Sequence, residues 1–291
     1  MNTKTIHFGQ FILAITIMSS SGPLGRYIDL PVPVIIWLRC VMAALALWVV
    51  VRLSGASYKV KSKSDFYKIF LTAILLGVHW ISYFLALKYS NVAIGMLSMF
   101  TYPVMTAVIE PIFFGSRLDL RSVMLALVGF SGIFLLVPEY SLDNQVTIGV
   151  LLGLFSALAY SLRNLISKQV LSSYSGLSVM MYQAGFIAVF LSPSAFWLPS
   201  GVFGDMDSNN WIALLLLGFY TTAIGHTLLV RSFSQFPVTM LSIISCLAPI
   251  LGIIQGFFFL KENPTNHVMI GGAIILLSAV LESARMLKKS A

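Results

Sequence analysis

Long apolar stretches, separated by short polar breaks, are the feature that most limits what this chain can fold into. A helix needs about 20 mainly apolar residues to cross the hydrocarbon core of a bilayer. Ten stretches of that kind follow one another along the 291 residues. We therefore predict an all-α membrane protein whose ten spanning helices cover residues 8–27, 32–53, 66–87, 91–114, 120–138, 147–168, 177–198, 210–231, 237–260 and 266–287.

The composition excludes an ordinary soluble domain. Hydrophobic residues make up 58% of the chain and charged residues only 10%, whereas soluble domains carry about 25% charged residues. The two cysteines, Cys40 and Cys246, lie far apart in apolar stretches, so we expect no disulfide framework, no zinc site and no other cofactor. The net charge of +8 is spread between the apolar stretches, which does not fit a nucleic-acid partner.

The positions of the basic residues predict the orientation in the membrane. With the N-terminus in the cytoplasm, fourteen of the 18 Lys and Arg residues fall at the inner side, and only Arg26, Lys88 and Lys261 fall outside. Both chain ends are then cytoplasmic, which agrees with an even number of spans in an inner membrane. The first stretch resembles a signal peptide, but the orientation and the repeat described next both require that it is retained.

An internal repeat divides the chain into two halves. Residues 92–132 align without gaps on residues 238–278, so that Pro103 matches Pro249. Residues 9–27 likewise align on residues 149–167. We expect five-helix units over residues 1–139 and 145–288.

An odd number of helices in each unit has a consequence for topology. The second unit must enter the membrane upside down relative to the first. Inverted repeats of this kind are frequent in secondary transporters, in which the substrate binds between the two repeats. The sequence therefore favours transport by alternating access.

Short motifs in both halves carry a resemblance to known proteins: Ala86–Val92, Pro103, Phe114–Arg117, Gly129–Gly132, Pro249, Leu260–Glu262 and Gly271–Ser278. In these positions the chain resembles the EamA family of the drug/metabolite transporter superfamily. This resemblance implies the ten-helix fold and transport of a small metabolite, such as the export of an amino acid. The family has a glutamate thirteen residues after each proline; Glu262 keeps this pattern, whereas Ser116 departs from it.

Polar and aromatic side chains inside the predicted helices are the candidates for a substrate cavity. Some recur at helical spacing, and His79 and Trp80 lie near the middle of their helix, away from interfacial aromatic belts. The resemblance places the cavity between the first, third, fourth, sixth, eighth and ninth helices. The candidates are Ser20, Arg39, His79, Trp80, Tyr83, Met99, Tyr102, Tyr160, Asn164, Tyr220, His226 and Ser245. For the small hydroxyl residues, hydrogen bonding within their own helix is the alternative.

Pro103 and Pro249 fall near the middle of the fourth and ninth predicted helices. A proline there frees the carbonyl four residues earlier, at Met99 or Ser245. In a bilayer such a carbonyl needs another partner or a wet cavity. We therefore predict either a flexible gating helix or a simple packing kink at each proline.

Few charges lie inside the predicted helices. A charge in a membrane is costly, so we expect Glu110 to pair with Arg163, and Arg39 to pair with Glu262 or Asp29. Alternatively, Glu110, Arg163 and Glu262 extend to the interface, and Arg39 binds a substrate carboxylate. No acid lies near the bilayer midplane, which predicts facilitated or weakly coupled transport, with a proton route through His79 or His226 as the alternative.

Other classes of function fit less well. An intramembrane enzyme needs clustered catalytic groups, and the four histidines are scattered along the chain. A channel that is never gated would not need an inverted repeat, although it could have one. We expect a small-molecule substrate and the lipid bilayer as partners, and the sequence gives no indication of oligomeric state.

Overall fold

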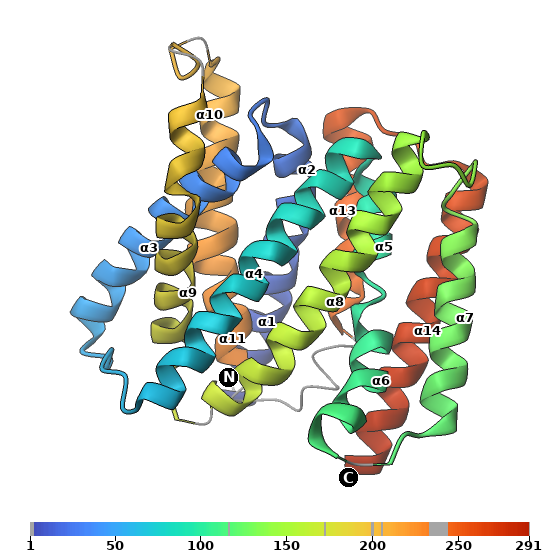
Figure 1. Ribbon diagram of the computed structural model, residues 1–291, viewed down its shortest axis with the longest axis horizontal. Helices are drawn as coiled ribbons and strands as arrows, with labels where there is room; N and C mark the ends of the chain where they lie inside the picture. The colour runs from blue at the N-terminus through green and yellow to red at the C-terminus, as the bar shows by residue number, and fades with distance from the viewer. Residues whose placement is uncertain are drawn as a thin grey trace.

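The computed structural model describes residues 3–115, 117–171, 173–198, 201–204, 206–232 and 244–290, and this part of the chain forms helices. Figure 1 shows long helices that run side by side between an upper and a lower edge of the molecule. Both marked chain ends lie at the lower edge. This is the arrangement expected of a chain that crosses a membrane an even number of times.

The first half contains five of the predicted spans. Its elements are α1 (Thr3–Ser19), α2 (Ser21–Tyr27), α3 (Val32–Ser54), α4 (Lys63–Tyr89), α5 (Val92–Met99), α6 (Tyr102–Phe114) and α7 (Leu120–Phe134). The first predicted span is divided between α1 and α2, and the fourth between α5 and α6.

The second half has the same plan. Its elements are α8 (Gln145–Leu171), α9 (Gly176–Leu191), the 3-10 helix η1 (Ser192–Trp197), α10 (Ser208–Leu215), the π-helix η2 (Leu216–His226), α11 (Thr227–Ser232), α13 (Leu247–Leu260) and α14 (Asn266–Ser290). The start of the ninth predicted span, before residue 244, lies outside the described residues, as does Ser116.

The described helices are long and apolar enough for a membrane protein. Seven stretches qualify by length and hydropathy as spans, and α7 and α13 are shorter apolar helices. Together with α1 and α2, they account for the ten predicted positions. Each polar break is short, and several begin a helix with a side-chain cap. Asp207 accepts a hydrogen bond of 2.7 Å from the backbone N–H of Asn210, and this bond lowers the pKa of its carboxyl.

The two halves are inverted relative to each other. In Figure 1, α1 rises from the lower edge, whereas its equivalent in the second half, α8, descends from the upper edge. The same reversal relates α7 to α14. Equivalent helices of the two halves also pack directly against each other, α3 against α9 and α7 against α14. The fold is that of two inverted five-helix repeats.

The two repeated prolines mark helix breaks rather than kinks within continuous helices. α5 ends at Met99 and α6 begins at Tyr102, and the two residues between them, Phe100 and Thr101, form a turn in which Thr101 keeps right-handed backbone angles. Pro103 stands in the first turn of α6, where its missing N–H costs no hydrogen bond. Pro249 follows the matching break at Cys246, in the first turn of α13. Both spans are therefore discontinuous near their middle.

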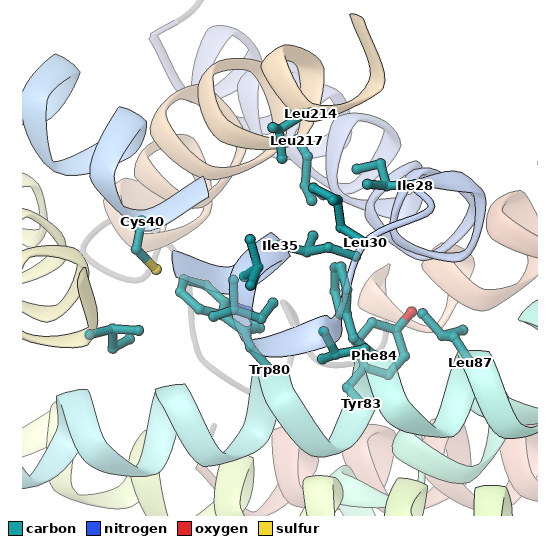
Figure 2. Packing of buried hydrophobic residues seen from close by; sticks show 14 of the residues in the cluster. Ile28, Leu30, Ile35, Cys40, Trp80, Tyr83, Phe84, Leu87, Leu214 and Leu217 are labelled. Atoms are coloured by element: carbon teal, nitrogen blue, oxygen red, sulfur yellow. The ribbon is translucent and has the colours of Figure 1, made fainter. Parts of the chain in front are cut away.

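The main hydrophobic core lies on the side of α4 that faces α3 and η2. Figure 2 shows Trp80, Tyr83, Phe84 and Leu87 projecting from α4 toward Ile35 of α3 and Leu217 of η2. Phe84 and Leu87 are completely buried. This packing orients the aromatic side chains of α4 and so positions the site described next.

Candidate functional site

A small cavity lies between the two halves at the level of the helix breaks. Its volume is about 70 Å³, which is room for roughly two water molecules. The lining comes from α1, α2, α4, α5, α6, α8, η2, α11 and α13, together with Phe100 and Ser245 beside the two breaks. Eight of the residues proposed from the sequence line it: His79, Trp80, Tyr83, Met99, Tyr102, Tyr160, His226 and Ser245.

Aromatic side chains form most of the wall of this cavity, and several of them carry a polar atom on the ring. The His79 ring lies 4.5 Å from the Tyr160 ring, centroid to centroid, and Tyr102 meets Tyr160 edge-on at 4.9 Å. On the other side, Trp80 and His226 make an edge contact at 5.4 Å. His79 is held by Ser156, whose hydroxyl oxygen lies 2.7 Å from Nδ1. The cavity thus offers ring faces for apolar groups and a few polar atoms for orientation.

Four residues proposed from the sequence do not line the cavity. Ser20 donates to the carbonyl of Ile17 at 2.6 Å, and its neighbour Ser21 faces the cavity instead. The amide oxygen of Asn164 accepts from Arg163 at 3.1 Å. Tyr220 is 39% exposed on the outside of the bundle. Residues two apart on a helix point in different directions, and Thr222 is the one of this pair that is buried.

Arg39 is the fourth of these residues, and it lies behind Trp80. Its guanidinium carbon is 4.2 Å from the centre of the Trp80 ring, and its Nε donates to the hydroxyl of Thr222 at 3.0 Å. The side chain is completely buried. The Trp80 ring therefore separates this cation from the cavity.

The structure gives Glu110 and Glu262 other partners than the ion pairs proposed from the sequence, and no ion pair joins Arg39 to Glu262 or Asp29 among the described residues. Glu110 pairs with Lys168 at 3.3 Å, which lies about one and a half helical turns nearer the end of α8 than Arg163. Glu262 pairs with Arg26 at 3.2 Å and accepts from the backbone N–H of Val92 at 2.8 Å, so it caps α5. These acids lie at the helix ends, where partly solvated partners reach them.

Arg163 is instead held by an amide. Its Nη2 donates to the side-chain oxygen of Gln183 at 2.7 Å, and the Gln183 amide donates to Thr72 at 2.8 Å. This buried network joins α4, α8 and α9. The sequence analysis did not include it, because an amide that accepts from an arginine leaves no charge pattern to detect.

Other lining residues also lacked a detectable pattern. Ile15, Met18, Met96, Phe100 and Leu229 line the cavity, but apolar residues in a membrane helix look the same whether they face a cavity, a neighbouring helix or lipid. Within the described residues, no group of His, Cys, Asp or Glu side chains is placed to hold a metal ion.

A larger apolar hollow of about 530 Å³ lies between α6, α7 and α8. Its lining includes Leu127, Phe155 and Leu158, which are exposed on the surface of the bundle. It therefore opens toward the membrane and offers apolar side chains only. For a polar solute, the smaller central cavity is the better candidate site.

Comparison with known proteins agrees with the fold and the inverted halves. The sequence profile of the EamA-like transporter family matches residues 8–137 and again residues 147–283. An uncharacterized transporter of Bacillus subtilis, YxxF, is 24% identical over 95% of this chain and 89% of its own length. A protein of Rickettsia bellii described as an S-adenosylmethionine uptake transporter is 22% identical over 97% of this chain and 94% of its own length.

A crystal structure of another protein superposes on 98% of both chains with a TM-score of 0.67 and 18% sequence identity. This likeness concerns the fold. Because the family profile covers each half in turn, the chain belongs to the EamA-like transporter family and is a multi-pass membrane transporter.

Proposed function

We propose that this protein is a secondary transporter of the inner membrane that exports an amino acid or a similar small amphipathic solute by alternating access. The observation that supports this most directly is the position of the aromatic cavity between the two inverted halves, beside the breaks at Phe100 and Cys246. Discontinuous helices at the repeat interface are where transporters of this architecture bind their substrates.

The small size of the cavity fits a closed state of such a transporter. A volume of about 70 Å³ cannot hold an amino acid, so the binding state must be wider. The span formed by α5 and α6 can change direction at the turn between them, where the regular helix is already interrupted. Because the halves are structurally similar, opening to either side then costs comparable free energy.

A ligand screen with two cavity variants tests the proposal. Purified protein is heated with amino acids and common metabolites, and a solute that binds raises the melting temperature. Trp80→Ala and His79→Ala should abolish this shift, because both side chains line the cavity. Trp48→Ala is the matched control, since Trp48 is half exposed on α3 and does not line the cavity.

Counterflow in proteoliposomes then tests the transport mechanism. An excess of unlabelled solute inside should drive transient uptake of labelled solute by a carrier, whereas a channel gives no such overshoot. If binding and uptake survive both cavity variants unchanged, the cavity is not the substrate site. If no solute gives counterflow, the protein is not a secondary transporter of these solutes.

A further inference from the structure

Arg39 is a buried cation whose charge no acid neutralises in the described part of the chain. Its side chain has no exposed surface, and both terminal nitrogens, Nη1 and Nη2, are buried without a hydrogen-bond partner. The acids that do form ion pairs there pair with Arg26, Lys168 and Arg285. A charge with free donors in a membrane protein is costly and typically has a function.

The surroundings of Arg39 hold its guanidinium in one orientation. Thr222 accepts from Nε at 3.0 Å, and its own hydroxyl proton goes to the carbonyl of Leu217 at 2.7 Å. A hydroxyl has only one proton, so Thr222 presents a lone pair to Arg39. The faces of Trp80 and Phe84 lie 4.2 and 5.4 Å from the guanidinium carbon. With Nε fixed in this way, the two free nitrogens form the fork that binds a carboxylate bidentately.

Trp80 connects this cation to the cavity. One side of its ring covers Arg39, while the ring also lines the cavity and contacts His226. Rotation of this single side chain would expose the guanidinium to the cavity and would enlarge the cavity at the same time. Thr222 belongs to the π-helix η2, and such widened turns occur frequently at functional sites.

The charge distribution around the cavity also favours an anion. Arg39 and Arg163 both act electrostatically on His79 and His226, which line the cavity. Arg163 keeps one buried nitrogen, Nε, without a partner. Among the described residues of the lining there is no aspartate or glutamate. A negatively charged group entering the cavity therefore lies near two cations behind its wall, and no acid of the described lining repels it.

We propose that Arg39 binds the carboxylate of the transported solute, and that Trp80 must turn aside to admit it. This inference rests on the proposed transport function and specifies the class of substrate. A carboxylate has two sources, a simple organic acid or the zwitterion of an amino acid. The aromatic wall accommodates an apolar or aromatic remainder in both cases.

Three probes of nearly identical shape and different charge test the proposal by thermal shift. Benzoate should raise the melting temperature of the wild-type protein, whereas neutral benzamide and cationic benzamidine should not. L-phenylalanine and L-phenylalaninamide form a second pair, which distinguishes the zwitterion from the simple acid. A shift with benzoate, with phenylalanine or with both supports a carboxylate site, and a shift with neither overturns it.

Variants of Arg39 show whether this residue is the binding group. Arg39→Met should weaken the binding of the active carboxylate probe by about tenfold or more, the loss of at least one charge-assisted hydrogen bond. Arg39→Lys, which keeps the charge but not the fork, should retain part of the affinity. The matched control is Arg52→Met, because Arg52 lies on the same helix and also stacks on aromatic rings, Trp48 and Tyr58, but it is exposed.

The melting temperature without a ligand separates binding from a packing role. Replacing a buried charge by an apolar residue of similar size is often neutral or stabilising, so the Arg39→Met protein should melt no lower than the wild type. Unchanged carboxylate binding in Arg39→Met would overturn the inference. The inference about Arg39 would also be overturned if the Arg39→Met protein carried out counterflow of a neutral or cationic solute as well as the wild type does. The proposed transport function would stand in that case.

Discussion

At the scale of single residues, most buried hydroxyls donate to backbone carbonyls of their own helix, whereas the buried cation Arg163 is held by side-chain amides. Arg163 donates to Gln183, which donates in turn to Thr72. We predict that Gln183→Leu destabilises the fold by about 3 kcal/mol, because it removes the shorter of the two side-chain oxygen acceptors of a buried guanidinium and leaves only Asn164. The melting temperature in detergent measures this loss.

Two further substitutions make this prediction specific. Gln183→Glu keeps an oxygen for Arg163 and loses only the donor to Thr72, so it should cost less than Gln183→Leu. Gln145→Leu makes the same chemical change at an exposed position at the start of α8, and it should have little effect. Equal losses in all three variants would show that the network does not stabilise the protein.

The residue scale is also where sequence analysis reached least far. Helical spacing and position along the predicted span identified His79, Trp80 and Tyr160 as candidates, because a polar or aromatic residue near the middle of a membrane helix is unusual. The ion partners could not be found in the same way. Whether Glu110 pairs with Arg163 or with Lys168 depends on about one and a half helical turns of register between helices that are distant in sequence.

At the scale of whole elements, close contact between backbones holds α7 against α14. A Cβ atom placed on Gly132 would lie 2.7 Å from the carbonyl oxygen of Gly271, which cannot move without shifting its helix. Gly132→Ala should therefore push the two helices apart and destabilise the protein by about 1–3 kcal/mol. This loss should appear as a lower melting temperature and as a smaller yield of monodisperse protein.

Gly185→Ala is the control for that substitution. Gly185 lies within α9, and a Cβ there would meet nothing within 4 Å. Since alanine favours a helix more than glycine does, this variant should be as stable as the wild type or slightly more stable. A loss of the same size at Gly185 would mean that helix packing at Gly132 is not the cause.

Elements were largely predictable because apolar length alone defines a membrane helix. The sequence located the spans to within a few residues, including α3 and α8. It did not predict the π-helix η2 or the division between α1 and α2. Both depend on how a helix adjusts to its neighbours, which leaves no periodic pattern in one stretch of sequence.

At the scale of the whole molecule, inversion places the two chain ends and the basic loops on one side. Figure 1 shows the α3–α4 connection at the same edge as the N- and C-termini, and the α7–α8 connection at the opposite edge. The first connection carries Lys59 and Lys61, and the second carries Glu139 and Asp143. Because basic loops stay in the cytoplasm, we predict that the termini are cytoplasmic.

Cysteine labelling in intact cells checks this orientation. The native thiols Cys40 and Cys246 are buried and should give little background with a membrane-impermeant maleimide. Asp143→Cys, at an exposed position, should react in intact spheroplasts. Lys59→Cys, equally exposed, should react only after the membrane is permeabilised. The reverse labelling pattern would show that the transporter has the opposite orientation in the membrane. The side from which its substrate enters would then have to be reassigned.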